Sequence, residues 1–227
     1  MARPKREPGV PEARDRMLDA FWELLEDNEC DKITVSMVCE KAGCYRGTFY
    51  YHFDSMEDLE QKAIAEVLYG KAGIQSIMDL LTAGVSNPEG MTDAATSASA
   101  WRLALIARRG KLELVESEVQ KDVVSMWRGM LCDGGEDLAP DSKAIIEAVA
   151  SLCLTVFVEA SVRRGGPDAT DESTFTPAVY SFMGDVTNCA LGRVCEVEGL
   201  SIDEVRERVD VAQISLVEDI AQAGISV

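Results

Sequence analysis

Apolar residues recur at helical spacing along almost the whole chain, and no segment alternates between apolar and polar residues for long. Met17, Phe21, Leu24 and Leu25, for example, share one face of a helix predicted between residues 11 and 28. This spacing is typical of amphipathic α-helices, whereas half-buried strands would alternate with period two. The sequence therefore predicts an all-α fold.

Two short helices joined by a glycine turn are predicted between residues 34 and 53. Thr34 suits the N-cap of the first helix, and Gly43 suits a left-handed residue just after its end. The second helix must end by Phe53, because Ser55 is a good N-cap for another helix. Two short helices around such a turn form a helix-turn-helix unit, whose second helix enters the DNA major groove.

The second of these helices is dense in hydrogen-bond donors. Three tyrosines, an arginine, a threonine and the chain's single histidine fall within eight residues: Tyr45, Arg46, Thr48, Tyr50, Tyr51 and His52. The alternative is a helical hairpin whose tyrosines are half-buried core residues. That number of donors exceeds what packing needs, so the pattern favours DNA binding.

The same region resembles the N-terminal domain of TetR-family transcriptional regulators. The resemblance rests on Thr34-Val35, Ala42-Gly43, the run RGTFYYHF from Arg46 to Phe53, Ser55 and Leu59. It covers roughly residues 11–69, and the rest of the chain is similar to the family only in size and helical character. It implies a basic arm at 1–10, a three-helix helix-turn-helix domain at 11–71, and a larger helical-bundle domain for ligand binding and dimerisation at 72–227.

The resemblance also implies roles for single residues. Tyr50 and His52 match positions that hold phosphates, and Thr34 matches a helix N-terminus that meets the DNA backbone. Tyr45, Arg46, Gly47 and Thr48 match positions that face base edges, where an arginine can pair with a guanine. Ser36 is a weaker candidate. The complete expected DNA-binding set is Thr34, Ser36, Tyr45, Arg46, Gly47, Thr48, Tyr50, Tyr51, His52, Arg3, Lys5 and Arg6.

Some positions depart from the family pattern. Met56 stands where a lysine often approaches a phosphate, Asp54 adds a negative charge nearby, and Tyr45 replaces a small N-cap residue. The basic arm could compensate by reaching phosphates or a minor groove, or it could be a disordered, solubilising tail. Cys44 starts the second helix, where a lowered thiol pKa would permit a redox role. Inert packing is the favoured interpretation of Cys44.

The charge of the chain at first argues against a nucleic-acid partner. There are 22 Lys and Arg against 40 Asp and Glu, a net of −18 at pH 7. Residues 1–62 hold 9 basic and 14 acidic side chains, a net of only −5, and no acid lies between Gly43 and Phe53. We therefore expect few phosphate contacts per subunit and an affinity that depends on base readout and dimer geometry.

Several classes of protein are disfavoured. One histidine and seven cysteines without a CxxC pair predict neither a disulfide framework nor a metal site. No nucleotide-binding or hydrolase motif is present, so we expect no enzyme and no cofactor. No apolar run approaches the roughly 18–20 residues of a membrane span, and no signal-peptide pattern opens the sequence, so a cytoplasmic location is expected.

The helices near 141–164 and 176–196 are the expected dimer contacts. Between 144 and 158 only Glu147, Ser151 and Thr155 are polar, so this helix should be buried on several sides. Gly184, Asn188 and Gly192 form a row of small or slim residues for close packing, either between subunits or within one. A capping box from Ser201 to Glu204, with Leu200 and Val205 as a hydrophobic staple, starts a last helix that ends near Gly224.

The sequence thus predicts a homodimeric transcriptional repressor that an unknown small molecule releases from a palindromic operator in double-stranded DNA. A TetR-like activator or a ligand-independent regulator is the alternative, and a helical protein-interaction adaptor is an alternative of another class. No effector site is predicted: Trp101, Met126, Trp127 and Phe157 could line a pocket, but large apolar residues at helical spacing are more often core.

Overall fold

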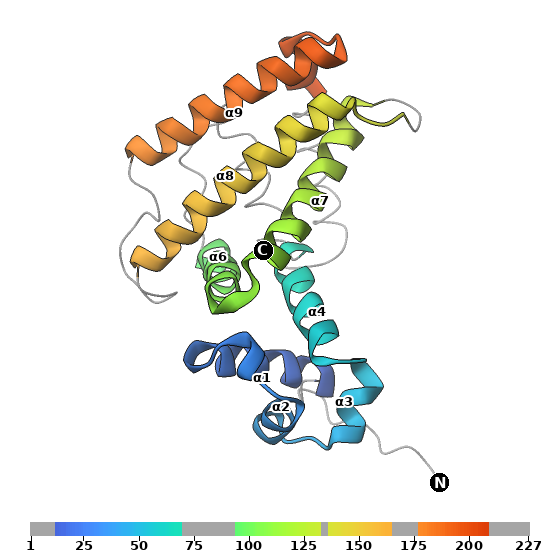
Figure 1. The fold of residues 1–227 in the computed structure, drawn as a ribbon, viewed down its shortest axis with the longest axis vertical. Helices are drawn as coiled ribbons and strands as arrows, with labels where there is room; N and C mark the ends of the chain where they lie inside the picture. The colour runs from blue at the N-terminus through green and yellow to red at the C-terminus, as the bar shows by residue number, and fades with distance from the viewer. Residues whose placement is uncertain (1–11, 70–93, 133–135, 165–176, 209–227) are drawn as a thin grey trace.

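The structure is a computed structural model that describes residues 12–69, 94–132, 136–164 and 177–208. All regular elements within these ranges are helical, which confirms the all-α prediction. Figure 1 shows a small group of helices at the lower end of the molecule and longer helices above it, with α4 leading from one to the other. We call residues 12–69 the head and the described residues from 94 onward the body.

The head consists of α1 (Ala13–Asp27), the 3-10 turn η1 (Cys30–Lys32), α2 (Val35–Ala42), α3 (Arg46–His52) and α4 (Met56–Tyr69). Phe21 and Leu25 of α1, Phe49 of α3, Phe53 and Leu59 are almost fully buried between these helices. The burial of these five large apolar side chains stabilises the head, including the short helices α2 and α3. Isolated peptides of this length would not remain helical in water.

The predicted helix boundaries of the head are confirmed. The Thr34 hydroxyl accepts a hydrogen bond from the Met37 amide (3.3 Å), so Thr34 caps α2. Gly43 follows α2 in the left-handed conformation, with φ of 63°. The Cys44 amide then donates to the Cys39 carbonyl (2.9 Å) and the Gly43 amide to the Glu40 carbonyl (3.3 Å), which is a Schellman motif.

This backbone conformation predicts opposite effects for two glycine substitutions. Gly43→Ala should lower the free energy of unfolding by about 1–2 kcal/mol, because an L-residue is strained in the left-handed region. Gly47→Ala, inside α3, should raise it by up to about 1 kcal/mol, because alanine is the better helix former. Neither new Cβ would meet an atom within 4 Å, so sterics do not distort the comparison. Urea denaturation checks both, and equal effects of the two variants would contradict the assignment.

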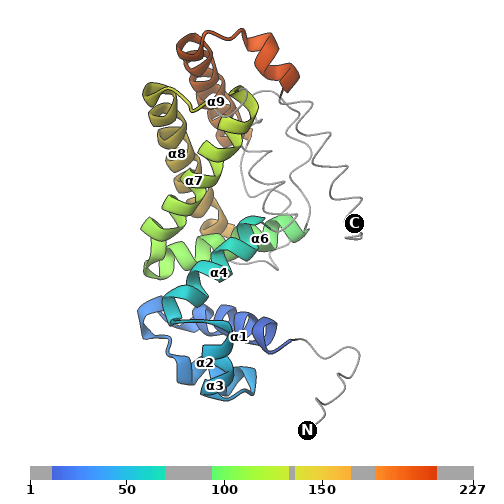
Figure 2. The same cartoon turned by 90° about the vertical axis from the view of Figure 1, so that its right-hand side faces the viewer.

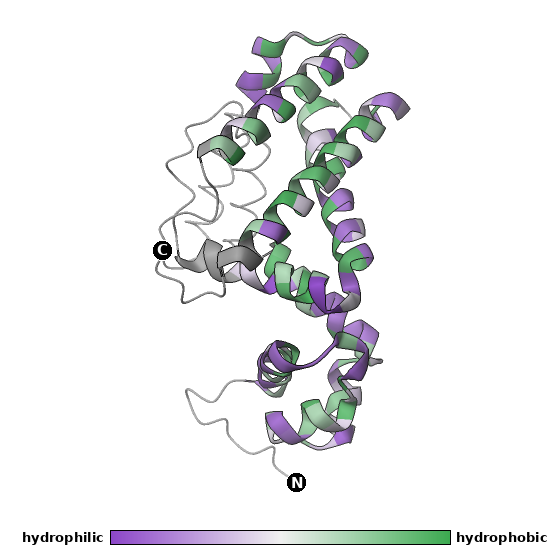
Figure 3. Ribbon diagram, turned by 60° about the vertical axis from the view of Figure 1, so that its left-hand side comes forward, coloured by the Kyte–Doolittle hydropathy of each residue, from purple (hydrophilic) through white to green (hydrophobic). Residues whose placement is uncertain are grey.

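The body contains α6 (Ala94–Ile106), the π-helical turn η3 (Ala107–Lys111), α7 (Leu112–Leu131), α8 (Pro140–Arg164), α9 (Pro177–Glu198) and a helical segment at 202–208. The long helices α7, α8 and α9 lie side by side, and α8 packs against α6, α7 and α9 (Figures 1 and 2). Hydrophobic residues run along much of this upper body (Figure 3). The central position of α8 agrees with its predicted burial on several sides.

The C-terminal capping box is also confirmed. The Glu204 amide donates to the Ser201 hydroxyl (3.2 Å), and the Ser201 amide donates to the Glu204 carboxylate (2.8 Å). Val205 is buried and Leu200 packs against the core, as the hydrophobic staple requires. The predicted end of this helix near Gly224 lies outside the described residues, as does the basic arm.

One break was not predicted from the sequence. Between α6 and α7 the chain leaves the helical conformation at Arg109 and Gly110, and Gly110 has φ of 101°. Within the described ranges, none of the helices is both long enough and apolar enough to cross a membrane.

Candidate nucleic-acid interface

The exposed side of α3 presents the aromatic and polar residues that the sequence singled out. The helix lies at the end of the head that faces away from the body (Figures 1 and 2). Tyr45, its N-cap residue, is 87% exposed, Tyr51 is 79% exposed and Tyr50 is 53% exposed. Arg46 and Gly47 are exposed as well, while Thr48 is half-buried. Several large aromatic side chains exposed close together on one helix are a feature of interaction sites.

The opposite side of α3 explains why these groups hold their positions. Phe49 is fully buried, and its ring packs edge-on against Tyr50 and tilted against Phe53, with centroids 5.4 Å apart in both pairs. The ring of Tyr50 is therefore supported by the core although the residue remains half exposed. Phe49 and Phe53 hold the motif together, and the polar groups of α3 remain available.

His52 ends α3 and is half-buried. Its ring meets the Tyr51 ring edge-on at 4.9 Å, and its carbonyl accepts a hydrogen bond from the Lys62 ammonium (3.2 Å). Lys62 also pairs with Asp58 (2.7 Å) and lies 5.4 Å from the centre of the Phe53 ring. These contacts attach the end of α3 to α4.

Sequence reasoning did not identify Lys62, although its place four residues after Asp58 indicates an ion pair on α4. The Lys62 ammonium, helped by a hydrogen bond from the Asp54 amide, holds the pKa of the Asp58 carboxyl below its usual range. Asp58 therefore stays ionised at neutral pH and keeps Lys62 in place.

The first helix of the motif presents Thr34 and Ser36, and both are exposed. The Thr34 hydroxyl points at the amide end of α2, where a phosphate would meet the helix dipole. Two contacts anchor α2 to α1: Arg16 donates to the Ala42 carbonyl (3.2 Å), and Lys41 pairs with Glu23 (2.8 Å). The head thus holds the start of α2 and the whole of α3 in a fixed relation.

The departures from the family pattern are visible here. Met56 is half-buried and packs against the core, and Asp54 is exposed. Cys44 is half-buried against the same core, as inert packing would require. Burial raises the pKa of the neighbouring Cys39 thiol to about 11, so Cys39 is a neutral thiol at physiological pH. Arg3, Lys5 and Arg6 of the basic arm lie outside the described residues.

Chemically, this surface offers hydroxyls, an imidazole, one guanidinium and a helix N-terminus. Such groups bind phosphates and base edges, and they include no nucleophile paired with a base. No group of three His, Cys, Asp or Glu side chains that could hold a metal ion occurs among the described residues.

Comparison with known proteins gives a family match for the head. Residues 17–62 match the family model of bacterial regulatory proteins, tetR family. The match spans most of α1, all of α2 and α3, and the first part of α4. Among curated proteins, no sequence matches the chain.

Two solved structures are similar to most of the chain. One is a tetR-family transcriptional regulator from Streptomyces coelicolor, with 14% identity over 95% of this chain and 99% of the other, and a TM-score of 0.47. The other is the dihydroxyacetone kinase operon activator DhaS, with 14% identity over 82% of this chain and 97% of the other, and a TM-score of 0.38.

Proposed function

The chain belongs to the TetR family of DNA-binding transcriptional regulators through its N-terminal domain, and we propose that it is a homodimeric repressor released from a palindromic operator by a small molecule. Regulators of this family are generally not enzymes. The observation that supports operator binding best is the outward face of α3, with Tyr45, Arg46 and Tyr51 exposed over a buried Phe49.

The proposed interface divides into two kinds of contact. Arg46, at the first turn of α3, reads base edges together with Tyr45, Gly47 and Thr48. Tyr50, Tyr51 and His52, with Thr34 and Ser36 of α2, position the DNA backbone, and Arg3, Lys5 and Arg6 add cations from the arm. Phosphate contacts fix the orientation of a protein on a duplex, and base contacts give the specificity.

Tyr50→Phe tests the backbone-positioning role. The ring contact with Phe49 survives, and only the hydroxyl is lost. Losing one hydrogen bond of about 0.5–1.5 kcal/mol should weaken binding roughly two- to twelvefold, and equally for a selected operator and a scrambled duplex. Fluorescence anisotropy with both duplexes measures this. A loss confined to the selected sequence would assign Tyr50 to base readout instead.

The proposed dimer rests on the outward face of α8 and α9. Ala144, Ala148 and Leu152 follow one another on the exposed side of α8, although they are apolar. On α9, Phe182 is 49% exposed, and a Cβ added at Gly192 would meet no atom within 4 Å. Packing inside the subunit therefore gives no reason for a glycine at 192, and the open space favours the between-subunit interpretation. A second copy would bury this surface.

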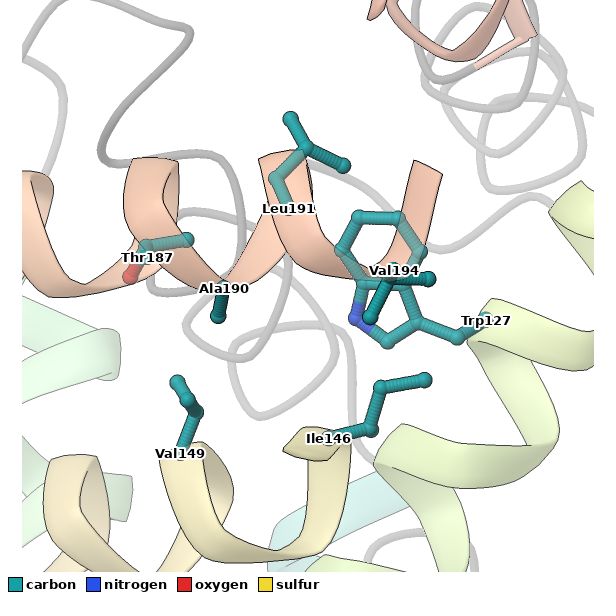
Figure 4. Close-up of a pocket in the computed structure, with 7 residues that line it drawn as sticks. All are labelled: Trp127, Ile146, Val149, Thr187, Ala190, Leu191 and Val194. Carbon is teal, nitrogen blue, oxygen red and sulfur yellow. The ribbon is translucent and has the colours of Figure 1, made fainter. Parts of the chain in front are cut away.

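An apolar pocket supports the response to a ligand. It lies between α7, α8 and α9 (Figure 4). Its free volume is about 20 Å³, room for roughly one water molecule, so a bound effector must widen it. The lining residues are Trp127, Ile146, Val149, Thr187, Ala190, Leu191 and Val194. Thr187 is the one lining residue with a hydroxyl, so the pocket suits a small, mainly apolar effector. Trp101 and Met126 pack against the main core, and Phe157 belongs to a separate cluster with Cys153 and Met183.

The dimer can adopt a conformation in which the spacing of its two heads does not fit the operator. An effector that binds this conformation more tightly lowers operator affinity. The factor by which it does so equals the factor by which operator DNA lowers the affinity for the effector. The proposed boundaries are the arm at 1–10, the DNA-binding domain at 11–71 and the ligand-binding and dimerisation domain at 72–227. We place the action of the protein on DNA in the cytoplasm.

Selection from random DNA tests the proposal. Duplexes with a random central region are incubated with the full chain at physiological salt, and the retained duplexes are sequenced. We expect an inverted repeat whose half-sites lie about one DNA turn apart, ~34–36 Å. A pool without an enriched sequence, together with no salt-dependent DNA binding, would contradict DNA binding and favour the protein-interaction adaptor.

A further inference from the structure

The break between α6 and α7 lies directly against the head. Gly110 adopts a left-handed conformation that other residues rarely accept, and a Cβ there would meet nothing within 4 Å. The glycine is therefore needed for the turn of the backbone and not for close packing. We call residues Ala107–Lys111, the turn η3, the elbow. It contacts η1 of the head.

Two basic side chains that flank Gly110 reach across to the head. The Arg109 guanidinium lies 3.6 Å from the Glu29 carboxylate and also donates a hydrogen bond to the Glu26 carbonyl at the end of α1. The Lys111 ammonium lies 2.8 Å from Asp31 of η1 and 3.1 Å from Glu60 of α4. Lys111 therefore joins two separate elements of the head to one point of the body.

The Lys111–Glu60 pair differs from the surface ion pairs of the chain because its carboxylate is buried. The side chain of Glu60 is 5% exposed and that of Lys111 is 23% exposed. The Cys30 thiol donates to the other oxygen of Glu60 (3.2 Å), and burial followed by this carboxylate raises the pKa of Cys30, which keeps the thiol protonated. The hydrogen-bonded Asp31 carboxylate, followed by Glu60, raises the pKa of Lys111, so its charge is permanent at neutral pH.

A buried carboxylate without its partner is strongly unfavourable, whereas exposed pairs contribute little. The head can rotate away from the elbow only by leaving Glu60 unpaired. A second contact lies on the neighbouring helix, where the Arg102 guanidinium of α6 lies 5.4 Å from the ring centre of Trp22 in α1. Helices α1 and α4 also pack against α6 and α7, and one apolar core runs through head and body. Apolar packing is not directional, so the Lys111–Glu60 pair is the contact that favours one angle between them.

We propose that Lys111 is a positioning residue for operator binding, which fixes the orientation of the head and hence the half-site spacing that a dimer accepts. This inference rests on the proposed function as a dimeric DNA-binding regulator. Lys111 itself touches no DNA: it acts through Asp31 and Glu60. Arg109 assists by holding Glu29 and the end of α1.

The spacing preference of the dimer tests this role. The probes are fluorescein-labelled duplexes with the half-sites that the wild-type chain selects, at the selected spacing and with one base pair inserted or deleted at the centre. For Lys111→Met we expect the ratio of affinities between selected and altered spacings to fall roughly two- to thirtyfold, the usual range for a residue that couples two domains. Loss of folding alone would lower affinity for all three duplexes by one common factor.

Matched variants separate positioning from stability. Lys111→Arg keeps the positive charge and should keep the wild-type spacing preference. Lys121→Met removes the exposed ion pair with Glu118 on α7 and should also leave the preference unchanged. If Lys111→Met folds poorly, Lys111→Met with Glu60→Gln removes both charges of that pair, and Asp31→Asn removes only the exposed partner. The double variant and Asp31→Asn should each weaken the preference for the selected half-site spacing, and Asp31→Asn should have the smaller effect.

Two results would overturn the inference, and they are distinguishable. A folded, dimeric Lys111→Met protein with the wild-type spacing preference would refute the positioning role and leave the proposed function intact. A wild-type chain that binds none of the duplexes would refute the proposed function, and the inference with it.

Discussion

Arg46→Ala should remove most of the discrimination between the selected operator and single-base variants of it. Arg46 is exposed at the first turn of α3, and no acidic residue lies between Gly43 and Phe53 to compete for its guanidinium. A bidentate pair with a guanine contributes about 1–3 kcal/mol of discrimination, so each subunit should lose roughly five- to 150-fold. Anisotropy titrations with the selected duplex and with duplexes changed at one guanine measure the loss.

Arg46→Lys is the matched control. Lysine keeps the positive charge but not the planar fork, so binding to a scrambled duplex should remain near wild type while discrimination falls. Equal discrimination by wild type, Arg46→Ala and Arg46→Lys would show that α3 is not the recognition helix.

The second large effect concerns the dimer. Leu152→Glu should convert the protein to a monomer at micromolar concentration, because it replaces the largest apolar side chain of the stripe Ala144–Ala148–Leu152 with a charge. Operator affinity should fall by orders of magnitude, since one head then binds one half-site. Light scattering should give 24.7 kDa for the variant and twice that for wild type.

Leu112→Glu provides the control for Leu152→Glu. Leu112 is 46% exposed, more than Leu152 at 37%, but it starts α7 away from the stripe. This variant should remain dimeric. A wild-type chain that is already monomeric, or a dimeric Leu152→Glu protein, would contradict the proposed interface.

Much of the head could be predicted because its signals are local. Thr34, Gly43 and Ser55 act on backbone groups within four residues, and the structure confirms each: Ser55, for example, accepts a hydrogen bond from the Asp58 amide (3.1 Å). The same is true of the capping box at Ser201 and Glu204. Hydrogen bonds over one turn depend little on the rest of the fold, and so they can be read from the sequence.

The contacts between head and body could not be predicted in this way. Glu60 and Lys111 are 51 residues apart, and nothing in either segment identifies the other as its partner. Gly110 stands in a helical pattern, where a single glycine is tolerated at a cost of about 1 kcal/mol, so the pattern did not indicate a break. Likewise, the apolar residues of α8 do not reveal that Ala144, Ala148 and Leu152 face outward.

The net charge of −18 agrees with an interface that contains few cations. Arg46 is the only Lys or Arg on α3, and Lys62 on the following helix α4 is already paired with Asp58. Few cations at the interface mean that few counterions are released on binding. We therefore expect a shallow dependence of operator affinity on salt.

Sequence-specific operator binding is best tested by an anisotropy titration of the wild-type chain with its selected duplex and with a scrambled duplex of equal length at physiological salt. We expect saturation at two chains per selected duplex, with an affinity about 10³-fold or more above that for the scrambled one. Equal affinity for the two duplexes, or no binding to either, would contradict sequence-specific binding.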